Sequence, residues 1–333
     1  MFKSRRRLVV VGAGLCLLAG AVHGQTKAAP PLVSIRPFHV GVCQLGKDHV
    51  LGLTHSATDR LPFVIYSFLV ESTNRQRALI DLGPKTTDYC NRMFIRYGLF
   101  RDLGSNRPPA ERFPDNMRQP YGNVFDQLRA QKIAPVDIGH IVFSHLHADH
   151  HGMDDAADGG GTESFTNAMM YVSAIGWDDN LRRRKDGHWN SYVDFAFADF
   201  LERASRAGRV RFADNATIFP GMRTLYLGGH SVCSQAVLLD TAAGLVIVAS
   251  DDVYLYSLLE ENVLPQIRTS PEKYRAALDR LVRLAMTERG IIIAMHDPVV
   301  WETYERAGKD WLTALKVVSD RAVHGYARRR GWE

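Results

Sequence analysis

Cysteine is scarce in this sequence, and no long hydrophobic run dominates it. Only 4 of its 333 residues are cysteines, and Cys16 belongs to an apolar N-terminal segment. The other three, Cys43, Cys90 and Cys233, can form at most one internal disulfide. We expect Cys43 to pair with Cys90, because Cys233 closely follows a candidate metal ligand, His230. The sequence therefore excludes a small scaffold held together by several disulfides.

The apolar run of residues 8–22 is shorter than the roughly 20 residues that a membrane-spanning helix requires. It ends in small residues before Gln25, and it follows the basic side chains of Lys3, Arg5, Arg6 and Arg7. This order is typical of a secretory signal peptide. We therefore expect residues 1–24 to be cleaved off and the mature chain to be periplasmic or secreted, with no stable membrane insertion after cleavage. A membrane anchor is the alternative.

The mature chain also has little net charge of either sign. The formal net charge of +5 falls to +1 once residues 1–24, with four basic and no acidic side chains, are removed. A protein that binds nucleic acid generally presents a strongly basic face. We therefore expect no nucleic-acid partner, and we interpret the basic clusters at residues 182–185 and 328–330 as solvated surface.

Strands and helices alternate along both halves of the chain. Apolar or alternating segments predict strands at residues 34–42, 61–71, 78–80, 138–143, 223–227, 236–240, 245–249 and 291–294. Helical spacing occurs at residues 123–131, 191–207 and 271–289, the last with Ser270 as its N-cap. The polar stretches 101–121 and 154–163 predict loops. No linker divides the chain, so residues 25–333 are expected to form one layered α/β domain.

The strongest signal is the segment Ser144-His145-Leu146-His147-Ala148-Asp149-His150-His151-Gly152, which follows an expected buried strand. Side chains of an extended chain alternate, so His145 and His147 face the same way. Asp149 and His150, on the turn beyond, are placed to face a second metal ion. Neutral imidazoles and carboxylates are ligands that zinc prefers, and a catalytic site keeps one position open for water. His151 is expected to lie outside the ligand set.

Four further motifs, each after an expected strand, complete a pattern that resembles the metallo-β-lactamase superfamily. In chain order they are Asp81-Leu82-Gly83, Gly228-Gly229-His230, Asp251 and Met295-His296. The resemblance covers about residues 34–320, and it implies an α/β fold of the metallo-β-lactamase-like kind, a four-layer αββα sandwich. The loop after His150 is enlarged at residues 154–162, which departs from the family and predicts a different pocket shape.

The resemblance implies two Zn²⁺ ions per chain. One is held by His145, His147 and His230, the other by Asp149, His150 and His296, and Asp251 bridges them. The two ions share a hydroxide, which is the nucleophile, because metal coordination brings the pKa of water from about 15.7 toward 7. Asp252 is the alternative bridge, and manganese, iron or cobalt could replace zinc.

Asp251 and Tyr254 form an Asp-x-x-Tyr arrangement that is similar to the acyl-homoserine lactonase branch of the superfamily. In that branch the tyrosine hydroxyl contacts the carbonyl or ring oxygen of the substrate, which makes Tyr254 a candidate catalytic residue, with Tyr256 as the alternative. The resemblance also implies a second role for Asp149, which would protonate the alkoxide that leaves when the ring opens.

The function that these residues favour is hydrolysis of a lactone or related ester, with a small molecule as substrate. A fold alone does not fix the substrate, and a periplasmic organophosphate triesterase carries the same ligand set. A class B β-lactamase is less favoured, because a carboxylate at the position of Asp251 is not part of its zinc site. A metal-binding protein without catalysis is the alternative from another class, and a homodimer is left open.

Overall fold

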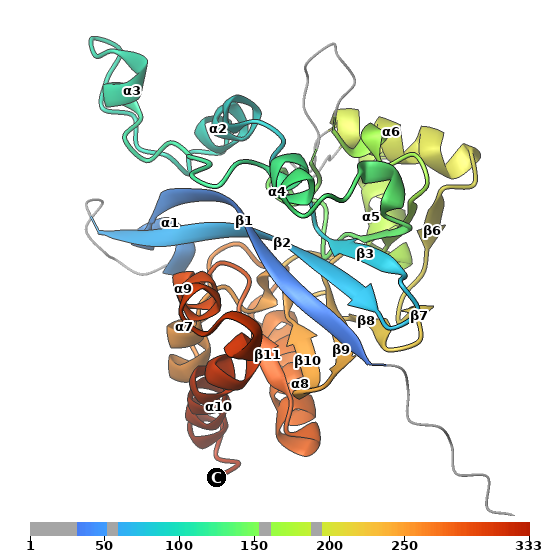
Figure 1. Ribbon diagram of the computed structural model, residues 1–333. Helices are drawn as coiled ribbons and strands as arrows, with labels where there is room; N and C mark the ends of the chain where they lie inside the picture. Colours follow the sequence, from blue (N-terminus) through green and yellow to red (C-terminus); the bar gives the residue numbers. More distant parts are fainter. Residues whose placement is uncertain (1–31, 52–58, 153–160, 188–194) are drawn as a thin grey trace, which may run out of the picture.

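The computed structural model of the chain describes residues 32–51, 59–152, 161–187 and 195–333. The expected signal peptide at residues 1–24 and most of the loop at 154–163 lie outside these ranges, so both stay predictions. Two long antiparallel strands, β1 (Val33–Gly46) and β2 (Arg60–Ser72), run through the middle of the molecule (Figure 1). The other described strands extend from this pair in two directions.

These strands form two halves. The first half continues from β2 through β3, which is antiparallel to β2, and then through parallel neighbours to β6. The second half is antiparallel except for its last pair, β10 with β11. Among the described residues, one pair of strands, β1 and β9, joins the halves, with Val33 opposite Thr241. The strand bounds are β3 (Arg77–Ile80), β4 (His140–Val142), β5 (Met169–Val172), β6 (Val210–Phe212), β7 (Thr217–Phe219), β8 (Met222–Tyr226), β9 (Gln235–Thr241), β10 (Gly244–Val248) and β11 (Ile291–Ile293).

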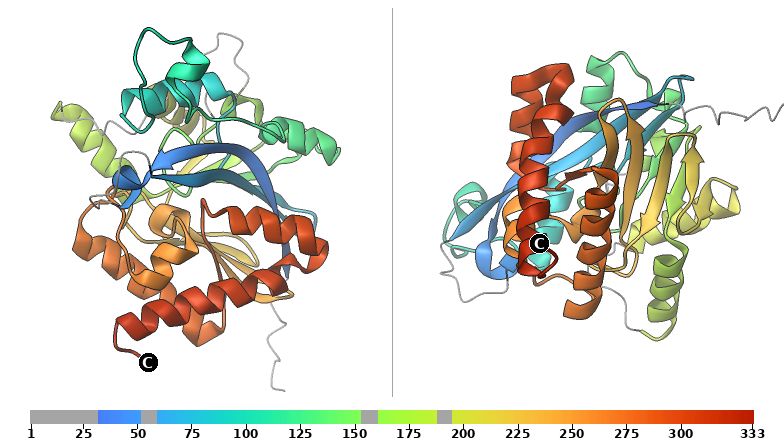
Figure 2. Two further views of the ribbon diagram at one scale, coloured as in Figure 1. Left: turned by 90° about the vertical axis from the view of Figure 1, so that its left-hand side faces the viewer. Right: turned by 90° about the horizontal axis from the view of Figure 1, so that it is seen from below.

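Helices cover both outer faces of the strands (Figures 1 and 2). One side carries α2 (Thr87–Arg96), α4 (Val124–Ala130), α5 (Ala174–Lys185) and α6 (Phe195–Arg206). The opposite side carries α7 (Tyr256–Glu261), α8 (Pro271–Glu288), α9 (Pro298–Ala307) and α10 (Trp311–Arg329). This order of layers is the predicted four-layer αββα sandwich. The short helices α1 (Lys47–Leu51) and α3 (Pro109–Arg112) lie at one end, and no helix of the described ranges has the length and hydropathy to cross a bilayer.

Two clusters of buried apolar side chains hold the layers together. One cluster packs α8 and α10 against the second half of the strands and includes Leu281, Ile292 and Tyr326. The other packs α4 and α6 against the first half and includes Leu128 and Phe197. Strand β11 is buried along its whole length, as expected for a parallel strand that is covered on both faces.

The clearest predicted helix is confirmed. The Ser270 side chain accepts a hydrogen bond from the backbone N–H of Lys273, Pro271 occupies the first turn of α8, and the helix ends at Arg289 in the left-handed region. Other elements were not predicted, because they are short or lack clear periodicity. They are β5, β6, β7, α1, α2, α3, α5, α7 and α9. Helix α3 interrupts the stretch 101–121, which the sequence predicted to be a loop throughout.

The predicted disulfide between Cys43 and Cys90 is wrong. Both residues and Cys233 are free thiols, and all three are buried. Burial raises the pKa of each thiol, so these side chains behave as small apolar groups. Cysteine spacing along a sequence does not give the distance between side chains, which is why the expectation failed.

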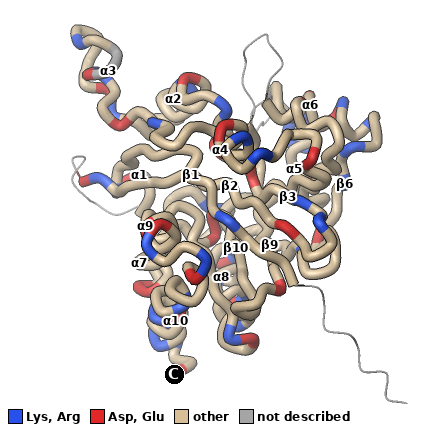
Figure 3. Tube along the Cα trace, in the orientation of Figure 1, with Lys and Arg blue, Asp and Glu red and all other residues tan. Residues whose placement is uncertain are grey.

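Acidic and basic residues are interspersed along the described parts of the chain (Figure 3). The residues of both basic clusters are exposed, as the sequence predicted, apart from the half-buried Arg330, and some of them also form ion pairs. Arg183 donates to Asp179 over 2.6 Å, and Arg330 at the end of α10 donates to Asp279 on α8 over 2.8 Å. The C-terminal arginines therefore help to attach α10 to its neighbour.

Candidate metal centre

The candidate ligands lie on four connections that leave the strands at one edge. The segment with His145, His147, Asp149 and His150 follows β4. The other three candidates follow β8, β10 and β11, and they are His230, Asp251 and His296. Short buried strands bring these distant parts of the chain to one place.

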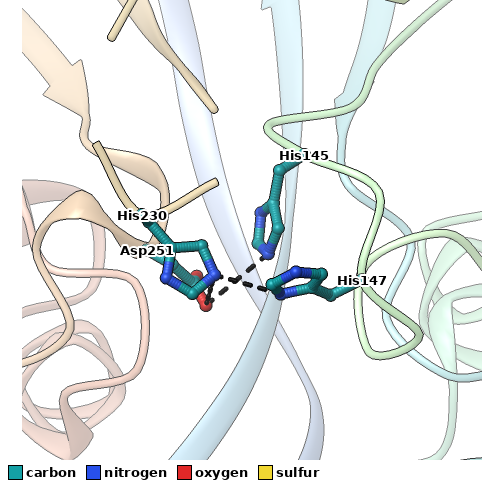
Figure 4. A group of neighbouring side chains, drawn as sticks. All are labelled: His145, His147, His230 and Asp251. Carbon is teal, nitrogen blue, oxygen red and sulfur yellow. Dashed lines mark hydrogen bonds and ion pairs between the residues drawn. The ribbon is translucent and has the colours of Figure 1, made fainter. Parts of the chain in front are cut away.

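All seven predicted ligands come together. Their ligand atoms form two groups within which every atom lies within 4.8 Å of the others, and every member is buried. The first group is His145, His147, His230 and Asp251, and the second is Asp149, His150 and His296. Figure 4 shows the first group, with the histidines of the β4 segment converging on His230 and Asp251 from across the strands.

The carboxylate of Asp251 lies between the two ligand groups. One of its oxygens faces the first group, and the other faces the second group. Its Oδ2 lies 3.5 Å from Nε2 of His230 and 3.7 Å from Nε2 of His145. Its Oδ1 lies 2.9 Å from Nε2 of His296 and 3.4 Å from Nε2 of His150. This is the arrangement that a carboxylate shared between two cations requires.

The donor set fits divalent metal ions. Nδ1 of His150 lies 2.9 Å from Oδ2 of Asp81, Nδ1 of His296 lies 2.8 Å from the carbonyl oxygen of Val64, and Nδ1 of His230 lies 3.0 Å from that of Ile267. These contacts are the outer hydrogen bonds that fix a ligating imidazole and leave its other nitrogen for a metal.

Unsatisfied atoms point to the same conclusion. Nε2 of His145 and Nε2 of His150 are buried and have no hydrogen-bond partner among the described residues. Buried polar atoms without a partner are costly, and they mark a place where a group is expected to bind. Two cations of the kind that the sequence implies would coordinate these nitrogens.

Asp81 supports the centre without belonging to either group. Besides His150, it accepts hydrogen bonds from the backbone N–H of Ser144 over 2.7 Å and from its hydroxyl over 2.6 Å. Gly83, two residues on, has a φ of +65°, and a side chain there would approach Cγ2 of Val40 to 2.2 Å. The Asp-Leu-Gly motif therefore fixes the segment that carries the histidines, because Asp81 is hydrogen-bonded to both Ser144 and His150.

Protonation states also suit most of the candidate ligands. Burial, with the neighbouring His230, lowers the pKa of His147 to about 3, so the imidazole is neutral. Burial alone would raise the pKa of Asp251, but His296, His150 and the other imidazoles hold it well below its ordinary value. Neutral imidazoles and ionised carboxylates are the forms that bind a cation.

His150 is the exception. Burial lowers its pKa, but the charges of Asp149, Asp251 and Asp81 raise it well above the ordinary value. The negative charges of these three carboxylates stabilise a positive charge at the position of His150. A bound cation would supply that charge in place of the proton.

The structure separates Asp251 from Asp252, which the sequence did not. Asp252 turns away from both groups, and its Oδ1 accepts the backbone N–H of His230 over 3.0 Å. Burial raises its pKa to about 7. A side chain at Gly229 would come within 2.2 Å of the same oxygen, so the glycine permits this contact.

The two candidate tyrosines are also distinguished. The Tyr254 hydroxyl lies 3.1 Å from Nδ1 of His230, and its ring lines a pocket together with Asp149 and Asp251. The Tyr256 hydroxyl instead donates to the carbonyl oxygen of Ile292 in the core. Only Tyr254 is placed to contact a molecule bound beside the ligand groups.

His151 is buried but belongs to neither ligand group. Its ring stacks on Phe197, with 4.2 Å between centroids. The position agrees with the expectation that His151 is not a ligand.

An apolar pocket opens onto the centre, and the space between its walls, open solvent included, is about 520 Å³. Its walls come from β1, α1, α2 and the irregular segment after α2, and they include Leu45, Val50, Phe94 and Leu99. Phe63 also lines it and stacks on His296, with 3.6 Å between ring centroids. No motif marks these residues in the sequence, because single apolar side chains on strands, short helices and irregular segments follow no recognisable pattern.

Comparison with known proteins agrees with the geometry. No protein-family model matches the chain. An N-acyl homoserine lactonase of Bacillus thuringiensis is 27% identical over 175 residues, which are 52% of this chain and 62% of that protein. The matched part thus spans less than two thirds of the relative.

Two solved structures extend the comparison over most of the chain. A B. thuringiensis AiiA variant with N-decanoyl-L-homoserine bound at its active site superposes with a TM-score of 0.60 and 21% identity, covering 83% of this chain and 97% of that one. AidC, a dizinc quorum-quenching lactonase in complex with a product, superposes with a TM-score of 0.55 and 14% identity, covering 81% and 89%. The chain therefore has the metallo-β-lactamase fold, and the predicted resemblance to the acyl-homoserine lactonase branch is confirmed.

Proposed function

We propose that this chain is a metal-dependent hydrolase that opens lactones or related esters. One observation carries the proposal. Seven buried ligand side chains, from four separate connections, form two groups that share Asp251 beside an apolar pocket. The sequence similarity to N-acyl homoserine lactonases supports the choice of a lactone over other esters.

Zinc is the proposed metal, with two ions per chain. His145, His147 and His230 would hold one ion, Asp149, His150 and His296 the other, and Asp251 both. Bound zinc supplies Lewis-acid chemistry and makes hydroxide available near neutral pH by lowering the pKa of water. The neighbouring AidC structure is dizinc, which supports this assignment.

The residues of the chain have distinct proposed roles in the reaction. The Tyr254 hydroxyl donates a hydrogen bond to the carbonyl or ring oxygen of the substrate. Asp149, which lines the same pocket, would take the proton of the attacking hydroxide and then pass it to the alkoxide oxygen when the ester bond breaks. The apolar pocket takes the acyl chain and keeps water away from it.

We also place the mature protein in the periplasm or outside the cell. The support is the order of basic, apolar and small residues in positions 1–24.

Metal content and substrate choice test the proposed function together. The purified chain is analysed for bound metals, and it is then assayed with an N-acyl homoserine lactone, an aryl phosphotriester and a β-lactam. We expect two zinc ions per chain and the highest kcat/KM for the lactone. Turnover of the phosphotriester far above that of the lactone would instead identify an organophosphate triesterase.

A chain that retains two metal ions but hydrolyses none of the three substrates would contradict the proposal and favour a metal-binding protein. The variant H145A provides the control. Its activity is expected to disappear together with metal, because His145 is completely buried in the first ligand group.

A further inference from the structure

A second, polar cleft adjoins the apolar pocket. It encloses about 1150 Å³ of space that is open to solvent, and it is lined by His230, Ser231, Arg183 and Arg268 among others. Four lining residues belong to both spaces, and they are Tyr97, Leu99, His147 and Ile267. The apolar pocket and the polar cleft therefore meet at a candidate ligand, His147.

Arg268 is held next to the candidate metal centre by its two neighbours in the chain. The carbonyl oxygen of Ile267 lies 3.0 Å from Nδ1 of His230, and the N–H of Thr269 donates to the carbonyl oxygen of Gly229 over 2.9 Å. The Thr269 hydroxyl donates to the same oxygen over 2.7 Å. These bonds fix the backbone on both sides of Arg268 against the connection that carries His230.

The two arginines of the cleft differ in how their charge is compensated. Arg183 donates to the carboxylate of Asp179 over 2.6 Å. Arg268 donates through Nη1 to the carbonyl oxygen of Pro265, and its Nε is buried without a partner among the described residues. Of the described carboxylates, none forms an ion pair with Arg268. The cleft thus contains one guanidinium whose charge is not neutralised.

The remaining acidic groups do not change this balance. Asp48 also lines the cleft, and its charge acts on Arg60. Glu272, at the exposed start of α8, is influenced by the charge of Arg268 but makes no ion pair with it. A guanidinium with free N–H donors binds a carboxylate with two parallel hydrogen bonds, which makes a carboxylate its natural partner.

We propose that Arg268 binds a carboxylate in the polar cleft, so that the preferred substrates are esters or lactones with an acyl chain on one side and a carboxylate on the other. The inference rests on the proposed hydrolase function and names a substrate class for it. The acyl chain occupies the apolar pocket, the ester bond lies at the candidate metal centre, and the carboxylate reaches Arg268. The carboxylate is either carried by the substrate, or formed at the metal centre when a neutral lactone is hydrolysed, in which case it reaches Arg268 only as the product moves away from the centre.

A matched pair of esters tests the first source. 4-(Hexanoyloxy)butanoate and 4-(hexanoyloxy)butanamide differ only in the charge of the terminal group. For the native chain we expect kcat/KM to be at least about tenfold higher for the carboxylate, on the scale of one charge-assisted hydrogen-bonded pair. The variant R268Q is expected to bring the ratio close to one. The variant R183Q is the matched control, and it is expected to keep the native ratio.

Product inhibition tests the second source. During hydrolysis of a neutral N-hexanoyl homoserine lactone, the product acid is expected to inhibit the native chain more strongly than R268Q. If the ester pair shows no discrimination but the product acid inhibits in an Arg268-dependent way, the carboxylate is the one formed by hydrolysis.

A binding measurement separates this proposal from the proposed function. Isothermal titration calorimetry with N-hexanoyl-4-aminobutanoate and its carboxamide needs no turnover. We expect tighter binding of the carboxylate to the native chain and equal binding of both compounds to R268Q. A carboxylate preference that persists in R268Q would overturn the role of Arg268. If the chain hydrolysed neither esters nor lactones but still bound the carboxylate more tightly than the carboxamide, only the proposed hydrolase function would be overturned.

Discussion

Asp251 and Asp252 are adjacent in the chain, but their carboxylates act on different parts of the centre. Asp251 lies within 3.7 Å of Nε2 of His145 and 2.9 Å from Nε2 of His296. Asp252 accepts the backbone N–H of His230, the residue that closes the first ligand group. One carboxylate thus meets the metal site directly, and the other fixes the backbone of a ligand.

This difference predicts separate effects of mutation. D251A is expected to lose bound metal and hydrolysis together, because both ligand groups depend on its oxygens. D252A leaves a buried N–H without an acceptor, which should cost about 1–3 kcal/mol of unfolding free energy. D252N keeps an acceptor oxygen and is the control, expected to resemble the native chain. Metal analysis and chemical denaturation measure the two effects. Equal metal loss in D251A and D252N would contradict this division.

The two tyrosines give a second comparison. Y254F removes the hydroxyl that lines the apolar pocket, and we expect kcat/KM for a lactone to fall about 100-fold with metal content unchanged, the scale for one lost donor to a developing oxyanion. Y256F removes a buried hydrogen bond to Ile292 and should cost about 1 kcal/mol of stability while activity remains. Steady-state kinetics and thermal unfolding of both variants test this. A larger loss of activity in Y256F would reverse the assignment.

A close contact behind the His230 connection gives a third prediction. A side chain at Gly176 would come within 2.1 Å of Cβ and 2.2 Å of Cα of Cys233. Alanine is normally favoured over glycine in a helix such as α5, but here we expect G176A to lower the unfolding free energy by about 1–3 kcal/mol, because the backbone near His230 must move. Metal affinity should weaken as well.

The matched variant is G139A. The nearest atom to a side chain at Gly139 would be the carbonyl oxygen of Arg77 at 3.8 Å, an ordinary contact. We expect this variant to unfold like the native chain. If both alanine variants were equally stable, the close approach of α5 to Cys233 would be refuted.

Much of the centre could be predicted because its information is local. His145, His147, Asp149 and His150 lie within one short segment, and the remaining candidates follow strands that apolar runs identify. The choice of Asp251 over Asp252 came only from the resemblance, since two adjacent carboxylates have the same pattern. Side-chain direction decides between them, and direction depends on the short helical turn that begins after β10.

The pocket walls and the polar cleft could not be predicted. Leu99, Ile267 and Arg268 lie in irregular segments far apart in the sequence, and their meeting depends on long-range hydrogen bonds such as that from the N–H of Gln266 to the carbonyl oxygen of Val50. The same reasoning applies to the thiols of Cys43 and Cys90, whose separation depends on packing around β1 and α2.

The fourth prediction concerns Asp115, a buried carboxylate in the loop after α3 that forms ion pairs with other parts of the chain. Asp115 is 2% exposed and pairs with both Arg60 and Arg101, the latter over 2.9 Å. D115A would remove a buried carboxylate and leave two half-buried guanidinium groups without a counter-charge, and we expect a loss of about 1–3 kcal/mol of unfolding free energy. D102A removes the partner of Arg112 on the exposed surface and is expected to change stability little. Urea unfolding compares the two, and equal losses would contradict the prediction.

Processing of the N-terminus is the last prediction. A basic stretch, an apolar run too short to cross a bilayer and small residues before Gln25 should be read by a bacterial export system as a signal peptide. Expressed as the full chain in a Gram-negative host, the protein is expected in the periplasmic fraction, with a mass that corresponds to a chain beginning at Gln25. Replacing Lys3, Arg5, Arg6 and Arg7 by glutamine removes the positive charge that precedes the apolar run, and the unprocessed chain should then accumulate. An intact N-terminus in the membrane fraction would show instead that residues 1–24 anchor the protein.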